Sequence, residues 1–267
     1  MNIRPSILPG CCMVFLQRQV VFIVLFWLLL PPGIPKAGSI RAQNAPNPYR
    51  LSWKLDAPLS IGSASGIGGA MWIKKHKKIF TPEDIERLNT QSVWRIDRFA
   101  TQNWHVPAQK TSDVFMYGSM ALPLLLFANA EMRQHAPKLA LIGLETYMLN
   151  AALTSLTKEL VQRKRPYLYN PDAPMHLKRK PDATSSFFSG HTSASAAATF
   201  LAAKMYADYH PNSRFKPYIW IGAAILPAVT GYLRVRGGKH YLTDVIVGYA
   251  VGAATGILVP HLHKQKQ

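Results

Sequence analysis

Three short polar clusters in this largely apolar chain carry residues that can bind an anion or exchange a proton. The first is KELVQRKRP, in which Lys158 and Arg165 stand seven residues apart. Seven residues make about two turns of a helix, so we expect both cations on one face, with Pro166 ending the helix. Taken alone, such a pair is better explained as solvated charge that complements the helix dipole.

The second cluster is SFFSGHTSAS, where Ser189, Gly190 and His191 precede an alanine-rich segment. The unpaired amide groups at the start of a helix bind anions, and serine and glycine let a ligand approach the backbone closely. The simpler interpretation is an ordinary helix cap with a histidine beside it.

The third cluster is RVRGGKHYLTD, in which Arg234 ends an apolar segment and His240 and Asp244 stand four residues apart. That spacing places the last two side chains on one helix face. An aspartate that accepts from one ring nitrogen would fix the tautomer and leave the other nitrogen basic and nucleophilic. A plain helix pair at this spacing is also common.

The elements that must position these clusters are five apolar segments, each near or somewhat below the ~17–25 residues that cross a bilayer. They span residues 114–130, 139–157, 194–206, 217–233 and 245–260. In an up-and-down arrangement, the segment ends that carry the clusters all fall at one end. The sequence therefore predicts an all-α, up-and-down bundle of about six helices that is membrane-embedded, with the active site at one end.

Together the clusters offer three cations, a helix N-terminus and two histidines. This set suits a tetrahedral dianion that one histidine attacks while the other protonates the leaving group.

Their order and spacing resemble the type 2 phosphatidic acid phosphatase superfamily, which includes bacterial acid phosphatases and vanadium haloperoxidases. The family pattern reads K-x6-RP, then PSGH, then SR-x5-H-x3-D. The matching positions, within residues 158–244, are Lys158, Arg165, Pro166, Ser189, Gly190, His191, Arg234, His240 and Asp244. Phe188 replaces the family proline and Leu233 the serine, which affects loop rigidity and substrate preference more than the reaction.

The resemblance implies a role for each position. His240 would be the nucleophile that forms a phosphohistidine, and Asp244 would orient it. His191 would be the general acid and then the base that activates water. The phosphate would be held by Lys158, Arg165, Ser189, Gly190 and Arg234. No metal and no other cofactor is implied, because the three cations supply the charge neutralisation that Mg²⁺ provides in other phosphoryl-transfer enzymes.

Composition fits an anionic partner. Lys and Arg number 31 against 13 Asp and Glu, for a formal net charge of +18. Five cations, Arg163, Lys164, Lys178, Arg179 and Lys180, lie near the proposed clamp as a basic lip or as solvated charge. With the motifs, this predicts an anionic phospholipid or lipid-linked phosphate substrate and a membrane as partners, and no nucleic acid. The oligomeric state is not predicted.

The N-terminus reads as a targeting segment. The short apolar run 20–30 follows two arginines, and residues 1–42 are expected to be a signal peptide cleaved after Ala42, or an uncleaved anchor. The two cysteines, Cys11 and Cys12, lie within it, so no disulfide framework is expected.

Residues 43–112 are expected to form an N-terminal extension, with a glycine-rich apolar segment at 59–73 and an amphipathic helix beginning near Thr81. Residues 113–267 are expected to form the catalytic phosphatase core. The glycine-rich segment is a poor membrane span, so it is predicted to be buried or re-entrant.

The leading hypothesis is a lipid phosphatase of the bacterial inner membrane whose active site faces the periplasm. Candidate substrates are lipid A, undecaprenyl diphosphate and phosphatidylglycerol phosphate. A mean hydropathy of only +0.01 keeps a soluble periplasmic nonspecific acid phosphatase as the alternative. A haloperoxidase and a non-catalytic polyanion-binding membrane protein are further alternatives.

Overall fold

The computed structural model describes residues 47–265, all of which belong to one compact unit. The expected signal peptide or anchor, residues 1–42, lies outside the described residues. The boundary expected at residue 113 falls inside a helix, so the extension and the core are continuous.

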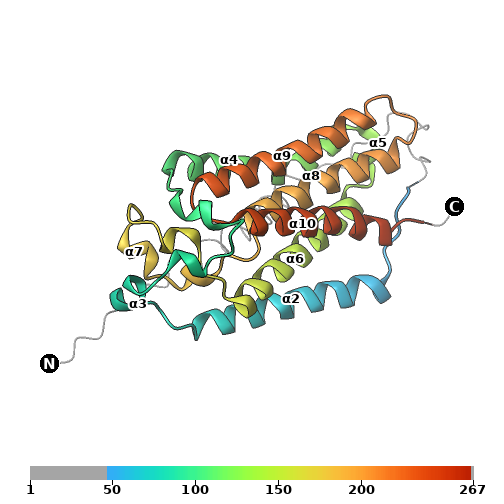
Figure 1. The fold of residues 1–267 in the computed structure, drawn as a ribbon. Helices are drawn as coiled ribbons and strands as arrows, with labels where there is room; N and C mark the ends of the chain where they lie inside the picture. Colours follow the sequence, from blue (N-terminus) through green and yellow to red (C-terminus); the bar gives the residue numbers. More distant parts are fainter. Residues whose placement is uncertain (1–46, 266–267) are drawn as a thin grey trace. The chain divides into compact units, whose positions relative to one another are not determined.

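The described chain is built from helices that run side by side (Figure 1). Its long helices are α2 (Trp53–Lys75), α4 (Val106–Ala121), α6 (Ala136–Val161), α8 (Gly190–Tyr209), α9 (Lys216–Arg236) and α10 (Leu242–Leu262). Short helices are α3 (Pro82–Glu86), α5 (Ala130–Gln134) and α7 (Met175–Lys178). Among residues 47–265, the one β pairing is an isolated bridge between Tyr49 and Lys264. The all-α bundle is therefore confirmed.

Helix α8 forms the centre of the bundle, where it packs against α4, α6, α9 and α10. Its contact with α10 is close because α10 presents glycines to it. A Cβ on Gly252 would lie 2.2 Å from the backbone oxygen of Ser193, and one on Gly248 would lie 2.6 Å from that of Ser189. The two helices therefore start together, and the amide of Ser189 donates to the carbonyl of Asp244 at 2.9 Å.

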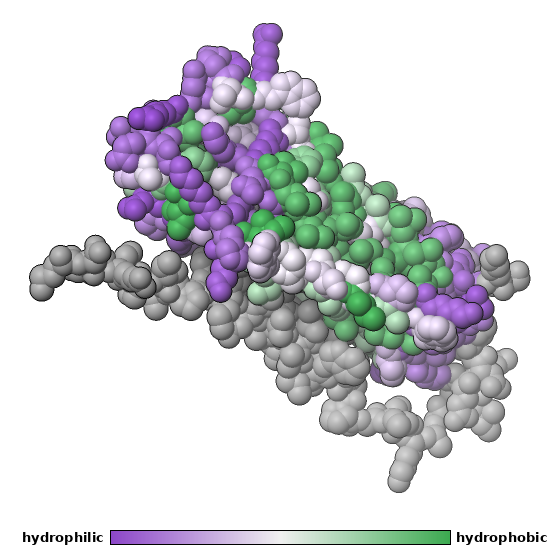
Figure 2. All heavy atoms as spheres, turned by 90° about the horizontal axis from the view of Figure 1, so that it is seen from below, coloured by the Kyte–Doolittle hydropathy of each residue, from purple (hydrophilic) through white to green (hydrophobic). Residues whose placement is uncertain are grey.

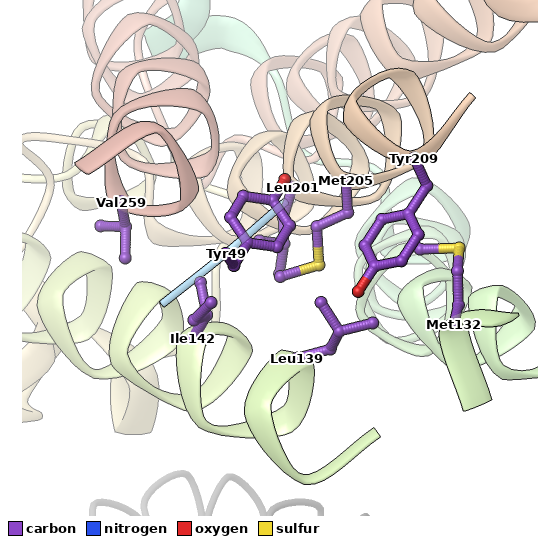
Figure 3. Packing of buried hydrophobic residues seen from close by; sticks show 8 residues of the cluster. All are labelled: Tyr49, Met132, Leu139, Ile142, Leu201, Met205, Tyr209 and Val259. Atoms are coloured by element: carbon purple, nitrogen blue, oxygen red, sulfur yellow. The ribbon is translucent and has the colours of Figure 1, made fainter. Parts of the chain in front are cut away.

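The opposite end of the bundle is held by an apolar cluster (Figure 3). Its members are Tyr49, Met132, Leu139, Ile142, Leu201, Met205, Tyr209 and Val259. Tyr49 is fully buried and its hydroxyl donates to Asp208 at 2.8 Å. The start of the described chain is thus anchored at the end away from the three polar clusters.

Helix α2 corrects the expectation for the glycine-rich segment. Residues 59–73 are not re-entrant, because they lie within a continuous helix of 23 residues, and within that helix Ser63 and Ala70 are the buried residues. At 1.5 Å per residue it is about 35 Å long, and it packs along α6. A Cβ on Gly66 would lie 3.0 Å from Leu156 of α6, so small residues bring the two helices close. Gly66 therefore serves packing, whereas a Cβ on Gly62 or Gly68 would meet no atom within 4 Å.

Several helices have the length and composition of membrane spans. They cover Val106–Ala128, Ala136–Leu168, Lys216–Arg236 and Leu242–Leu262. On the face drawn in Figure 2, apolar side chains gather in a band between two hydrophilic ends. This pattern is that of a membrane-embedded helical bundle and does not favour the soluble alternative.

Candidate active site

The three polar clusters meet at one end of the bundle. The end of α6, the start of α8, the end of α9 and the loop before α10 supply them. Arg165 Nη1 lies 3.2 Å from His240 Nε2, and a Cβ on Gly190 would lie 3.8 Å from Lys158 Nζ. Arg165 and His240, which stand 75 positions apart in the sequence, therefore lie in one site.

The first cluster differs from its prediction, because Lys158 and Arg165 do not share a helix face. Helix α6 ends at Val161, and Gln162 adopts a left-handed conformation with φ of 49°. Arg165 is extended, and its amide donates to the carbonyl of Ala183 at 2.8 Å. The chain thus leaves the helix to pair with the loop that precedes α8.

The Arg165 side chain is buried and held from several sides. Its Nε donates to the carbonyl of Asp182 at 2.9 Å, and Nη1 donates to the carbonyl of Lys239 at 3.0 Å. Its Nη2 forms an ion pair with Asp182 Oδ2 at 2.8 Å. Lys158 Nζ is fixed in a similar way and donates to the carbonyl of Ser185 at 3.1 Å.

His240 has neighbours that fix its tautomer. Its Nδ1 lies 2.8 Å from the carbonyl oxygen of Ser186, and its Nε2 lies 3.2 Å from Arg165 Nη1. A carbonyl oxygen can only accept and a guanidinium can only donate, so Nδ1 carries the hydrogen and Nε2 presents a lone pair. Burial, with Arg165, Lys158 and Arg234 nearby, holds the pKa of His240 well below its usual value. The ring is therefore neutral, as a nucleophile requires.

Asp244 does not make the direct contact that the sequence predicts. Its Oδ2 lies 3.6 Å from His240 Nδ1, beyond a hydrogen bond. Asp244 instead accepts from the Ser186 hydroxyl at 2.6 Å, from the Tyr241 amide at 3.0 Å and from Arg163 Nη1 at 2.5 Å. Because Ser186 also supplies the carbonyl that binds His240, Asp244 orients the histidine through that residue.

Arg163 links this network to the N-terminal extension, a role that the sequence did not reveal. Its Nη2 lies 2.7 Å from Asp97 Oδ2, and its guanidinium stacks 4.2 Å from the centre of the Tyr241 ring. Asp97 is fully buried and also accepts from the amide of Thr243 at 3.1 Å. Arg163 therefore holds Asp244 in place. It is not part of the basic lip that the sequence predicts.

His191 is the second residue of α8, and its partner is a carboxylate that the sequence did not single out. Its Nε2 lies 2.8 Å from Asp113 Oδ1 of α4. The same oxygen accepts from Arg234 Nη1 at 3.3 Å. Ser189 caps α8 as expected, because its side chain accepts from the amide of Thr192. The signal that could have found Asp113 is its place directly before the uncharged apolar run 114–130.

One N–H donor of Arg234, on Nε, is available to a ligand at this site. Its Nη1 donates to the Ser112 hydroxyl at 3.1 Å, whereas its buried Nε has no hydrogen-bond partner among residues 47–265. A buried donor without a partner is costly, so a ligand oxygen at this position would stabilise it.

A comparison with known protein families matches the part of the chain that carries the three polar clusters. Residues 139–267 match the model of the PAP2 superfamily. This matched stretch, the PAP2 segment, makes up just under half of the chain.

Two curated proteins are similar to parts of the chain. Phosphatidylglycerophosphatase B of Bacillus subtilis (strain 168) is 28% identical over 143 residues, which cover 53% of this chain and 66% of that protein. Phospholipid phosphatase 1 of Rattus norvegicus is 35% identical over 79 residues, or 28% of this chain and 27% of that protein. Each match thus spans only part of the relative.

A solved structure also resembles the chain. The crystal structure of a transmembrane PAP2 type phosphatidylglycerolphosphate phosphatase from Bacillus subtilis aligns with a TM-score of 0.42 and 18% identity. The alignment covers 91% of this chain and 94% of that one.

Part of the site lies outside the PAP2 segment. Lys77, Asp97 and Asp113 all precede residue 139. Lys77 pairs with Glu159 at 2.8 Å, and both side chains are at most 4% exposed. Ser185 joins this pair, because its hydroxyl receives from Lys77 and donates to Glu159, at 3.1 Å each. The N-terminal extension therefore supports the loop that holds Lys158 and His240.

The cations of the PAP2 segment raise the positive potential at this end. The pKa of Lys239 is lowered to about 8 by burial and by Arg165 and Arg234. Burial alone would raise the pKa of Asp182, but Arg165 and other cations hold it below its usual range. Such a site favours a ligand with two negative charges.

Proposed function

We propose that the chain is a metal-independent phosphatase that hydrolyses phosphate monoesters or diphosphates of membrane lipids through a phosphohistidine intermediate. One observation carries the proposal: His240, whose Nδ1 is bound to the Ser186 carbonyl, presents Nε2 3.2 Å from Arg165, a cation expected to bind the phosphate. Lys158 and Arg234 complete the expected phosphate clamp.

In the first step, Nε2 of His240 attacks phosphorus while the bond from phosphorus to the leaving oxygen breaks. His191 donates a proton to that oxygen. The non-bridging oxygens are held by Lys158, Arg165 and Arg234 and by the amide of Gly190 at the start of α8. Losing one such preorganised donor typically costs about 10²–10³ in rate.

In the second step, water attacks phosphorus and the phosphorus–nitrogen bond breaks. His191 takes the proton of the water, phosphate leaves, and His240 returns to its tautomer with Nδ1–H on Ser186. Asp113 stabilises the protonated state of His191 that alternates between the two steps.

A lipid substrate is supported by the apolar spans and by the band of apolar side chains in Figure 2. The Bacillus subtilis relative is named for phosphatidylglycerophosphate and the rat relative for phospholipids. We propose phosphatidylglycerol phosphate, lipid A and undecaprenyl diphosphate as the substrates to compare.

For the location, we propose the inner membrane, with the catalytic end facing the periplasm. Segments at the opposite end each carry a cation, namely Arg50, Arg133, Arg214 and Lys264, but the catalytic end carries Arg163, Lys164, Lys178, Arg179 and Lys180 as well, so charge alone does not set the orientation. Because α2 runs along the whole bundle, residues 47–52 lie at the end away from the site. A periplasmic site thus requires residue 47 in the cytoplasm, which is incompatible with a leader cleaved in the periplasm.

Cysteine labelling tests the orientation. With Cys11 and Cys12 replaced by serine, Asp172→Cys reports the catalytic end and Asn212→Cys the opposite end. A membrane-impermeant maleimide added to intact spheroplasts is expected to label only Asp172→Cys. Labelling of Asn212→Cys alone would place the site in the cytoplasm.

The activity is tested with detergent-purified protein and its His240→Ala variant, by phosphate release from the three lipids and from a soluble aryl phosphate. We expect turnover of at least one lipid, and an acid-labile phosphoenzyme that the variant lacks. Full activity of His240→Ala would overturn the nucleophile assignment. Turnover of the soluble ester alone would favour an acid phosphatase, and binding without turnover would favour a polyanion-binding protein.

A further inference from the structure

A second group of ionisable side chains lies at the end of the bundle opposite the proposed active site. Asp56 comes from the first turn of α2, Glu145 from α6, and His263 follows the end of α10. The side chains of His263 and Glu145 are 0% and 1% exposed, and that of Asp56 is 17% exposed. Buried ionisable groups are costly in a membrane protein and mark functional positions.

The inner atoms of this triad converge. His263 Nε2 lies 2.9 Å from Asp56 Oδ1 and 3.2 Å from Glu145 Oε2. One atom of each residue lies within 4.8 Å of the others. Tetrahedral ligands about 2.0–2.1 Å from a zinc ion stand about 3.3 Å apart, which is close to these separations.

The outer atoms are held by other groups. His263 Nδ1 donates to the carbonyl of Val259 at 2.8 Å, which turns Nε2 toward the carboxylates. Val259 itself is fixed in the apolar cluster of Figure 3. Asp56 Oδ2 accepts from the amide of Ser52 at 2.9 Å, and Glu145 Oε1 accepts from the hydroxyl of Ser60 at 3.4 Å. Metal-binding histidines and carboxylates are oriented in this way.

Charge and hydrogen bonding point to a cation. Two carboxylates face one imidazole, so one negative charge is in excess even when His263 is protonated. Glu145 Oε2 is buried and receives no hydrogen bond within residues 47–265, although it lies at ion-pair distance from His263. A divalent cation with a neutral imidazole would balance both carboxylates.

We infer that Asp56, Glu145 and His263 bind a divalent transition-metal ion, with zinc as the best match. One imidazole nitrogen with two carboxylates suits zinc, whereas Mg²⁺ and Ca²⁺ prefer oxygen ligands alone. Water or the Ser60 hydroxyl would complete the coordination. The ion would join α2 to α6 and α10, and it takes no part in the reaction at the other end. The ligands come from residues far apart in the sequence, which is why no sequence motif revealed them.

The test uses the full chain in detergent, freed of metal by chelator and titrated with Zn²⁺ and with Co²⁺. Bound metal is measured by mass spectrometry after desalting, and coordination by the visible absorption of Co²⁺. The variants are Glu145→Gln and His263→Gln. The matched control is Asp208→Asn, which removes a carboxylate only 6% exposed at the same end. We expect about one zinc ion per chain in the wild type and the control, and at least tenfold weaker binding in both variants.

Thermal unfolding gives a second readout. Zn²⁺ is expected to raise the Tm of the wild type and to leave that of Glu145→Gln unchanged. If that variant does not fold, Asp56→Asn replaces it, because Asp56 lies nearest the surface. Phosphate release at the other end reports folding. Absence of stoichiometric binding, or equal binding by all variants, would overturn the site and leave an ion-paired triad or an adventitious ion only.

Discussion

Asp113→Asn is the substitution that most directly tests the proton-transfer half of the mechanism. Asp113 Oδ1 lies 2.8 Å from His191 Nε2 and 3.3 Å from Arg234 Nη1. Asparagine keeps the shape and an accepting oxygen but loses the charge that stabilises protonated His191. The variant should therefore fold and bind phosphate, yet protonate the leaving oxygen poorly.

The expected size follows from the ion pair. Opposite unit charges about 4 Å apart interact by roughly 4 kcal/mol at an effective dielectric constant of about 20. The Asp113 side chain is 49% exposed, so water screens a large part of this energy. We expect a loss of about 1.4–2.7 kcal/mol in transition-state stabilisation, or about 10- to 100-fold in kcat/KM.

The assay compares two leaving groups. An alkyl phosphate needs a proton on its leaving oxygen, whereas p-nitrophenyl phosphate leaves without one. The defect of Asp113→Asn in kcat/KM, which reports phosphoenzyme formation and not the later hydrolysis common to both esters, should be about 10- to 100-fold for the alkyl ester and much smaller for the aryl ester. Asp182→Asn is the control, because Asp182 is 48% exposed and pairs with Arg165; it should change KM without a leaving-group dependence. Equal defects of Asp113→Asn on both esters would refute the reasoning.

Three further outcomes are expected. Lys239 carries its charge below its pKa of about 8 and loses it above, so KM should rise as the pH passes through 8, and Lys239→Met should flatten that rise; an unchanged pH profile would contradict this. Lys77→Met leaves Glu159 buried without its partner and should destabilise the protein by about 3–5 kcal/mol, as read from thermal unfolding. Adding Glu159→Gln should restore most of the loss, and equal instability of both proteins would exclude the ion pair as its source. Gly252→Ala places a Cβ 2.2 Å from the Ser193 carbonyl and should lower the Tm, because the contact between α8 and α10 must open; a wild-type Tm would show that the contact is not restrictive.

The sequence anticipated the helical architecture well, because each apolar segment carries its own signal. The segments 194–206, 217–233 and 245–260 lie inside α8, α9 and α10, with a few residues added at each end. Helix α2 was missed as a full helix because its glycines and serines lower hydropathy. The value of Gly66 lies in its close contact with α6, which a pattern within one segment does not contain.

The sequence predicted the site residues that belong to the three motifs. It did not predict the contacts that these residues make with distant parts of the chain. The meeting of Lys158, Arg165 and His240 followed from the order of the helices. That Arg165 lies beyond the helix depends on its pairing with Ala183, and that Asp244 reaches His240 through Ser186 depends on how two loops cross. Such contacts arise from tertiary packing and leave no periodic pattern in the sequence.

The loop at Ser185 and Ser186 sets the spacing between two residues of the site. The carbonyl of Ser185 holds Lys158, and the next carbonyl along the chain holds the ring of His240. One peptide unit, with about 3.8 Å between its α-carbons, therefore sets the distance between a phosphate-binding ammonium and the attacking nitrogen. The hydroxyls of the same two serines fix the loop to Glu159 and to Asp244. A single inserted residue between the two serines would separate these contacts, so the length of this loop is constrained together with its composition.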